Sequence, residues 1–258
     1  MRTVREVTTP ATVDELRRAA PAGRWQRRSR TARRVLGEVG AGGVLVLAAQ
    51  RALPRRLAHI EWFVVQELLP AAARPMPPDG DVRWATPDDD ALLASIGGDV
   101  AVSRARRLAG DAAAVCVRDG RLAGHVYLRS GHYDEQGMIV RLRDDERWIY
   151  DGVVAPDLRG AGIYPRLVRT VSEDLAHRGV LRLLSAIDRL NVPSLRAARR
   201  RGGTAIGAVL MVRVLGVSVR REDWHDGVRW RVHRGPCDLH PPSLETARRR
   251  PLPTGRPG

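Results

Sequence analysis

Residues 153–171 read VVAPDLRGAGIYPRLVRTV, and this stretch decides how the rest of the chain is interpreted. It predicts a strand that ends at Val154, a loop with two glycines at residues 159–162, and a helix that opens at Ile163. Glycine lets the backbone approach a ligand closely, and the first N–H groups of a helix have no partner within it. The helix dipole and Arg159 both add positive charge here, so the loop suits a pyrophosphate.

Two other classes of phosphate-binding loop do not fit this stretch. It lacks the Lys-Ser/Thr pair of a P-loop and the third glycine of the dinucleotide-binding fingerprint. A strand–turn–helix corner with a purely structural role is the alternative to a ligand loop.

The segment 82–234 shows strand and helix patterns on both sides of the loop. Residues 163–177 carry apolar side chains every four residues, which predicts a helix with one apolar stripe against a sheet. Asp119-Gly120 and Asp226-Gly227 are typical of tight hairpin turns. A short helix is expected at Asn191–Arg201. Strands are expected at Val82–Ala85, Ala113–Val117, Leu122–Leu128, Trp148–Val154, Leu181–Ala186, Ala205–Val219 and Val228–Val232.

Residues 154–164 resemble V-x-P-x-x-R-G-x-G-x-G/A, the signature of the GNAT superfamily of acyl-CoA-dependent N-acetyltransferases. The match runs through Ile163, whereas Tyr164 replaces the final small residue. Residues 191–194 (NVPS) resemble the start of a second family motif, although the tyrosine and phenylalanine common after it are missing. The resemblance covers about residues 82–219. It implies an α/β (α+β) fold with a mixed, mostly antiparallel sheet flanked by helices, and an N-terminal extension.

The resemblance also implies a site for acetyl-CoA as co-substrate, with no metal. The pantetheine arm would lie beside the strand that ends at Val154, and its pyrophosphate would lie against the glycine loop. The residues expected to bind it are Val153, Val154, Arg159, Gly160, Ala161, Gly162, Ile163, Tyr164, Asn191 and Ser194.

Direct attack of an amine on a thioester needs a deprotonated amine and a stabilised or protonated thiolate. Asp151 and Tyr150, on the strand before the loop, are the candidate catalytic residues. A structural hydrogen-bond role for Asp151 and a core position for Tyr150 are the alternatives. His132, Tyr133, Asp134 and Glu135 cluster where an acceptor loop or a solvated loop could lie.

Composition divides the chain into four parts. Residues 1–69 are expected to form a basic N-terminal extension that packs on the main domain, with a helix near Thr31–Val44. Residues 70–81 are Pro-rich and predict a linker, residues 82–234 form the acetyltransferase-like domain, and residues 235–258 predict a disordered Pro/Arg-rich tail.

The number of cysteines and the length of the apolar stretches indicate the cellular location of the protein. Cys116 and Cys237 are too few for a disulfide framework, and no Cys/His cluster has metal-ligand spacing. The longest apolar stretch, residues 42–49, is too short to cross a bilayer, and the N-terminus lacks the apolar segment of a secretory signal. We therefore expect a reduced, metal-free, cytoplasmic protein with no membrane partner.

The charge is strongly positive, with a formal net charge of +15 and 44 basic residues that are all arginine. Residues 1–56 carry most of the excess. They match no helix-turn-helix or zinc pattern, so any nucleic-acid binding is expected to be weak and non-specific.

Three functions follow from these observations. The first is N-acetyl transfer to a primary amine of a small molecule or a protein. The second is a non-catalytic acyl-CoA-binding regulatory module, which the missing residues of the second motif favour. The third is a nucleic-acid-associated factor that acts through the Arg-rich N-terminus. The sequence does not indicate an oligomeric state.

Overall fold

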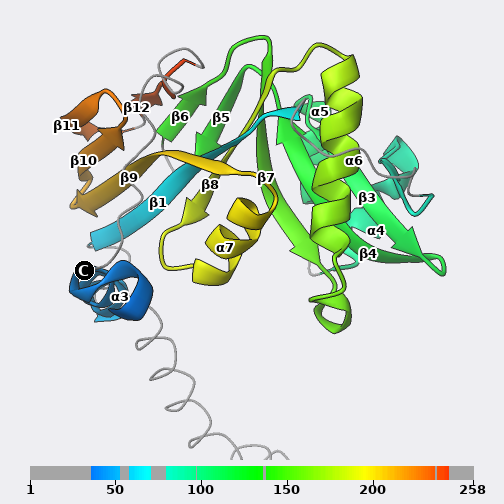
Figure 1. Ribbon diagram of the computed structural model, residues 1–258, viewed down its shortest axis with the longest axis horizontal. Coiled ribbons are helices and arrows are strands. Elements are labelled where there is room, and N and C mark those ends of the chain that lie inside the picture. Colours follow the sequence, from blue (N-terminus) through cyan, green and yellow to red (C-terminus); the bar gives the residue numbers. More distant parts are fainter. Residues whose placement is uncertain are drawn as a thin grey trace, which may run out of the picture.

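The computed structural model describes residues 36–52, 58–70, 80–96, 98–135, 138–235 and 237–243 (Figure 1). The α-helices are α3 (Ala41–Ala52), α4 (Asp90–Ala94), α5 (Val100–Leu108), α6 (Ile163–His177) and α7 (Val192–Arg200). The strands are β1 (Ala58–Leu68), β2 (Val82–Trp84), β3 (Ala112–Arg118), β4 (Arg121–Arg129), β5 (His132–Glu135), β6 (Met138–Arg141), β7 (Glu146–Val154), β8 (Arg182–Asp188), β9 (Thr204–Val214), β10 (Val217–Trp224), β11 (Gly227–Arg234) and β12 (Cys237–Leu239).

The main sheet has nine strands in the order β11-β10-β9-β1-β8-β7-β4-β3-β2. Neighbours in this sheet are antiparallel, apart from the parallel pair β7 and β8. A second, small sheet has the order β12-β6-β5. The predicted mixed, mostly antiparallel sheet flanked by helices is confirmed.

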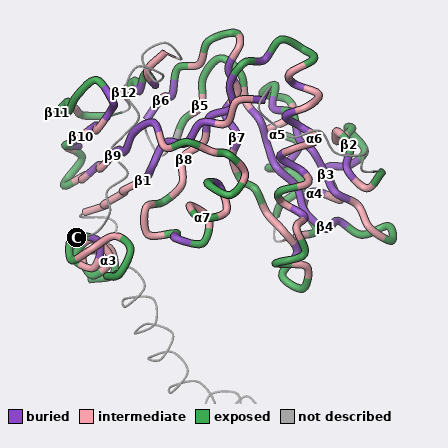
Figure 2. The backbone as a smooth tube through the Cα atoms, in the orientation of Figure 1, coloured by how far each residue is buried: buried purple, intermediate pink, exposed green. Residues whose placement is uncertain are grey.

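The central strands of the main sheet are buried between two layers. Helix α6 packs on strands β2, β3, β4 and β7 and covers this part of the sheet in Figure 1. Leu167 and Val171 of its apolar stripe are buried in one core cluster with residues of β3 and β4. On the other face Met138, Val140 and Leu239 of the small sheet pack with Trp148. Figure 2 shows the resulting buried stretches along the central strands, with exposed residues at the turns.

Strand β1 corrects the predicted domain boundaries. The sequence predicted that residues 1–69 form an extension that packs on the main domain, whereas β1 is inserted between β8 and β9 and is antiparallel to both. Phe63, Val64 and Val65 are all buried, as expected for an apolar run that has a strand on each side and a covered sheet on each face. Residues 58–68 are therefore part of the sheet itself.

The C-terminal segment is also a correction, because residues 237–243 were predicted to belong to a disordered tail. Strand β12 pairs in parallel with β6, and Leu239 is fully buried. Two buried arginines bind its backbone: Arg220 donates to Asp238 O at 2.8 Å and Arg182 donates to Pro242 O at 2.6 Å. One apolar residue and two arginine partners thus hold a segment that its prolines alone would leave extended.

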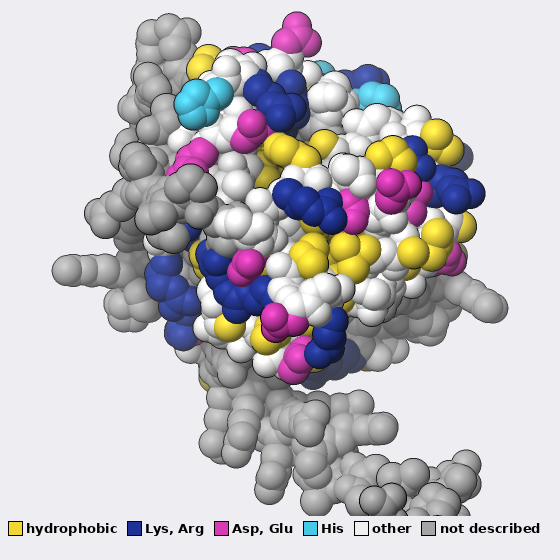
Figure 3. Space-filling model, turned by 90° about the vertical axis from the view of Figure 1, so that its right-hand side faces the viewer, with side chains coloured by type: hydrophobic (Ala, Val, Ile, Leu, Met, Phe, Trp, Pro, Cys, Tyr) yellow, Lys and Arg dark blue, Asp and Glu magenta, His cyan; other side chains and the backbone are white. Residues whose placement is uncertain are grey.

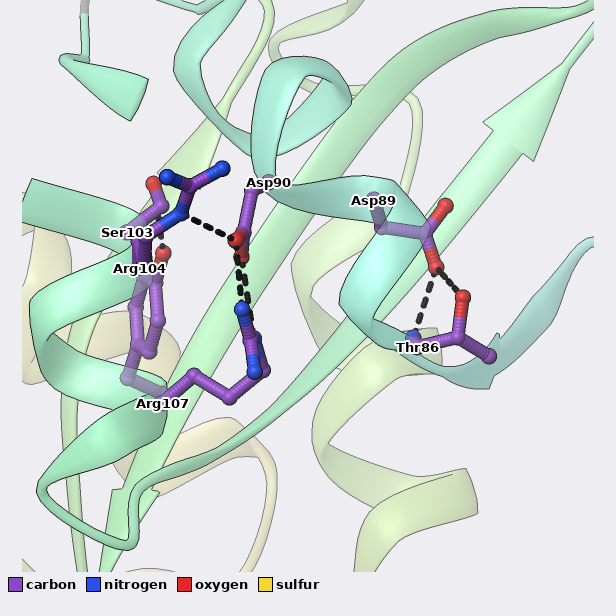
Figure 4. A network of polar contacts seen from close by, with 7 residues as sticks. Thr86, Asp89, Asp90, Ser103, Arg104 and Arg107 are labelled. Atoms are coloured by element: carbon purple, nitrogen blue, oxygen red, sulfur yellow. Dashed lines mark hydrogen bonds and ion pairs between the residues drawn. The ribbon is translucent and has the colours of Figure 1, made fainter. Parts of the chain in front are cut away.

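Turns and helix caps fix the chain locally, and the Asp119-Gly120 turn is where the sequence predicted it. Asp119 and Gly120 both have positive φ in the β3–β4 hairpin. The Asp89 carboxylate accepts from the Thr86 N–H at 2.7 Å and from its hydroxyl at 3.0 Å, while Arg104 and Arg107 pair with Asp90 (Figure 4). Asp99 caps α5 through the N–H of Ala101 at 2.7 Å.

Two predicted elements have different boundaries. The expected strand Ala205–Val219 is two strands, β9 and β10, because Leu215 and Gly216 both have positive φ and turn the chain between them. The helix expected at Thr31–Val44 lies partly outside the described residues. In the described part residues 36–39 are helical, Gly40 with a φ of 80° interrupts them, and α3 then runs from Ala41 to Ala52.

Charge on one face of the molecule is mixed. Figure 3 shows arginines and carboxylates side by side there, with apolar side chains between them. On this face the positive net charge does not form one continuous basic surface.

Candidate functional site

The site begins where two neighbouring strands part. Parallel pairing of β7 with β8 stops at Trp148 and Leu184, although β7 continues to Val154 and β8 to Asp188. Beyond this point β7 stays paired with β4, and β8 stays paired with β1. The backbone edges that face each other across the opening therefore have no strand partner in the sheet.

A bulge shapes the β7 side of this opening. The pairing of β4 with β7 shifts register between His125 and Tyr127, and Asp151 opposite has a φ of 45°. A non-glycine residue in the left-handed region is uncommon, and such bulges re-aim the side chains that follow.

A cavity of about 730 Å³ occupies the opening. Its wall comes from β7, the glycine loop, the start of α6, the end of β8 and the start of α7. Of the residues expected from the sequence, all but Ala161 line it: Tyr150, Asp151, Val153, Val154, Arg159, Gly160, Gly162, Ile163, Tyr164, Asn191 and Ser194.

The glycine loop has the backbone that its sequence requires. Gly160 has a φ of +89° and Gly162, which caps α6, has a φ of +77°. The first described backbone bond of the helix runs from Arg166 N to Gly162 O, so the N–H groups of the first turn carry no helical partner. These groups and the dipole of a 15-residue helix make this end of the cavity favourable for an anion.

Arginines reinforce that end. Arg159, Arg200 and Arg201 line the cavity, and none of the three pairs with a carboxylate in the described part of the chain. The structure therefore brings fixed positive charge to the place where the sequence predicted a pyrophosphate.

Tyr164, the departure from the family signature, lines the cavity. Its ring packs against the backbone of Gly152 on β7, and the Arg201 guanidinium lies 4.7 Å from the ring centre. Burial raises the pKa of the Tyr164 hydroxyl and lowers the pKa of Arg201. One side chain thus connects α6, β7 and the end of α7.

The two candidate catalytic residues have strong partners. The Asp151 carboxylate is bound by Arg106, which also lies over the Tyr150 ring. The Tyr150 hydroxyl donates to buried Asp111 at 2.5 Å, and burial, together with this carboxylate, raises the pKa of the phenol. Arg129 pairs with the same Asp111. Both candidates line the cavity, but their polar groups are already engaged.

The second motif supplies the start of α7. Asn191 caps this helix, accepting from Ser194 N at 3.4 Å, so part of its role is structural. Both residues also line the cavity.

Sequence reasoning missed Asp188, Arg201 and the cavity residues of β1. Asp188 follows the predicted strand Leu181–Ala186, and a carboxylate at that strand end was an available signal. Gln66 and Glu67 gave no such signal, because they join the cavity only through the insertion of β1 beside β8.

Two kinds of feature are not found in the described residues. Their histidines, cysteines and carboxylates form no group that could hold a metal ion. No helix in the part of the chain that the structure describes is long and apolar enough to cross a membrane.

Comparison with known families agrees with this geometry. Residues 78–203 match the family model described as "Acetyltransferase (GNAT) family". Over residues 78–203 the chain therefore has a domain similar to the GNAT acetyltransferases. No curated protein matches the chain.

Similar solved structures include a GNAT-family protein from Novosphingobium aromaticivorans, with 18% identity, a TM-score of 0.46, and coverage of 60% of this chain and 63% of that one. The aminoglycoside N-acetyltransferase AAC(6')-Iy in complex with CoA has 17% identity, a TM-score of 0.40, and coverage of 47% and 90%. A ribosomal-protein-alanine N-acetyltransferase from Brucella melitensis has 20% identity, a TM-score of 0.39, and coverage of 52% and 99%. The chain spans less than two thirds of the first of these proteins, and function is inferred below from the chain's own site.

Proposed function

We propose that the protein moves an acetyl group from acetyl-CoA to a primary amine by direct transfer. The observation that carries this proposal is the divergence of β7 and β8, which opens onto the N-terminus of α6. A cleft with free strand edges and an anion-binding end suits a ligand that is peptide-like at one end and a pyrophosphate at the other.

The chain's own groups would divide the ligand between them. The N–H groups of residues 160–163 and the Arg159 side chain would hold the pyrophosphate, with Arg200 and Arg201 nearby. The free backbone edge at Val153 and Val154 would bond the pantetheine arm and polarise the thioester carbonyl, as an oxyanion-type donor does. Asn191 and Ser194 would line the arm from the α7 side.

The acceptor would be a primary amine of a small molecule or of a protein. Its nitrogen would attack the thioester carbonyl carbon, the C–N bond would form, and the C–S bond would break with its electron pair leaving on sulfur. A preformed cavity that holds both reactants supplies proximity, which is a large part of the rate gain in such bimolecular steps.

A non-catalytic acyl-CoA-binding module is the second candidate. It is favoured by the engagement of Asp151 with Arg106 and of Tyr150 with Asp111, which leaves both predicted catalytic groups occupied. The two functions share the binding cleft and differ only in turnover.

Calorimetric titration with CoA tests the shared binding site. Gly160→Val fills the space where the ligand backbone would approach, and we expect it to weaken CoA binding about 10- to 100-fold through lost charge-assisted hydrogen bonds. Gly179→Val is the matched control, because Gly179 also has positive φ, has open space around it, and lies outside the cavity.

The expected result is weak binding by Gly160→Val and normal binding by Gly179→Val. Equal affinity of wild type and Gly160→Val for CoA would show that the glycine loop does not bind the pyrophosphate.

A further inference from the structure

Three carboxylates among the described residues line the cavity: Glu67, Asp151 and Asp188. Glu67 Oε2 accepts from Arg182 Nε at 2.8 Å, and Arg106 binds Asp151. Two of the three are therefore neutralised by an arginine.

Asp188 differs from the other two. It is the last residue of β8, opposite Phe63 of β1, and its side chain is exposed at the cavity wall. Asp188 Oδ1 accepts from the Leu190 N–H at 2.7 Å, which fixes the carboxylate. Within the described residues no arginine or histidine pairs with this carboxylate, which lines the cavity.

The other proton-carrying side chains of the cavity are less available. The Tyr150 hydroxyl already donates to Asp111, and the Tyr164 ring is packed between Gly152 and Arg201. No described histidine lines the cavity. By elimination, the group best placed to accept a proton there is Asp188.

We propose that Asp188 is the general base of the transfer, a role that rests on the proposed function above. It would bind the acceptor's ammonium group and take one proton from it, leaving a neutral amine with a free electron pair. That pair forms the C–N bond, and the C–S electron pair leaves as the thiolate. The second proton lost from nitrogen after attack goes to the thiolate or to solvent.

The surroundings of Asp188 support this role. Partial desolvation at the cavity wall raises the pKa of Asp188, and the Leu190 hydrogen bond lowers it by less. Burial also raises the pKa of Glu61 on β1, and the Asp188 charge adds to that rise. A carboxylate with a raised pKa is a stronger base for an ammonium proton than an ordinary one.

The charged groups around the opening come from five elements. They are Glu61 with His59 on β1, Arg213 on β9, Arg189 in the β8–α7 loop, and Asp151 with Arg106 across the cavity. Arg189 lies 4.5 Å from the ring centre of Trp62, so it is directed to that ring.

The test is the pH dependence of acetyl transfer with a panel of alkyl diamines, amino sugars and lysine peptides. In wild type, kcat/KM for the amine falls in acid as Asp188 is protonated, at a higher pH than an ordinary aspartate would give. We expect Asp188→Asn to lower kcat about 100-fold or more, to lose that acidic limb, and to keep the affinity for CoA. Asp188→Glu should recover part of the rate.

The control is Asp226→Asn, an exposed carboxylate in the β10–β11 turn, which should match wild type. An unchanged acidic limb in Asp188→Asn, or its loss in Asp151→Asn instead, would overturn the assignment while leaving the proposed function intact. Absence of turnover by wild type across the panel, with CoA bound normally, would overturn both.

Discussion

Gly152 has no side chain, and the Tyr164 ring occupies the space that a side chain would need. A Cβ at Gly152 would lie 2.2 Å from Tyr164 Cε2. The backbone of Gly152 does not have positive φ, so space alone makes alanine unfavourable there. We expect Gly152→Ala to destabilise the protein by about 1–3 kcal/mol through overpacking, as measured by denaturant unfolding. In a Tyr164→Ala background most of that cost should disappear. An equal cost in both backgrounds would mean that the ring is not the obstacle.

The glycine loop could be predicted from the sequence, whereas the partners of the candidate catalytic residues could not. The binding loop at residues 159–164 could be predicted because its chemistry is local: two glycines, an arginine and the start of a helix. The partners of Asp151 and Tyr150 were not predictable, because Arg106 and Asp111 lie about forty residues earlier and only the fold brings them together. The same long-range contacts decide that Asp188, and not Asp151, is the carboxylate left without a cation.

Strand β1 lies in the middle of the main sheet, so a charge buried on it should unfold the protein. Val65 is fully buried, with β8 on one side and β9 on the other. Val65→Asp places an unpaired charge in that position, and its cost of several kcal/mol is comparable with the whole stability of a domain. We expect loss of the thermal unfolding transition. Val232→Asp, on the exposed edge strand β11, is the matched control and should unfold like wild type. A normal transition in Val65→Asp would contradict the central position of β1.

The apolar residues of β1 suit a buried strand, but no sequence signal gave its position in the sheet. Its partners on β8 and β9 are more than 100 residues downstream. By contrast α6, whose apolar stripe is local, begins and ends where the sequence predicted. The insertion of β1 between two strands that are distant in the sequence is thus the part of the fold that the apolar pattern could not predict.

At the scale of the whole molecule, Arg182 joins four segments. This fully buried side chain binds Glu67 of β1, Glu146 of β7 and the backbone of Pro242, from its own place on β8. Arg182→Met leaves two buried carboxylates without their cation, so we expect a loss of about 3–5 kcal/mol in the free energy of unfolding. Adding Glu67→Gln and Glu146→Gln should restore part of it. A loss below about 1 kcal/mol, the range of an exposed ion pair, would show that Arg182 does not hold these segments together.

The most direct test of acetyl transfer is to measure the free thiol that the wild-type chain releases from acetyl-CoA with the same amine panel. Mass spectrometry then identifies the acetylated acceptor. We predict amine-dependent thiol release that equals the amount of acetylated amine formed. The result that would contradict acetyl transfer is normal CoA binding with no thiol released for any amine, because the cleft would then bind the acyl-CoA without using it.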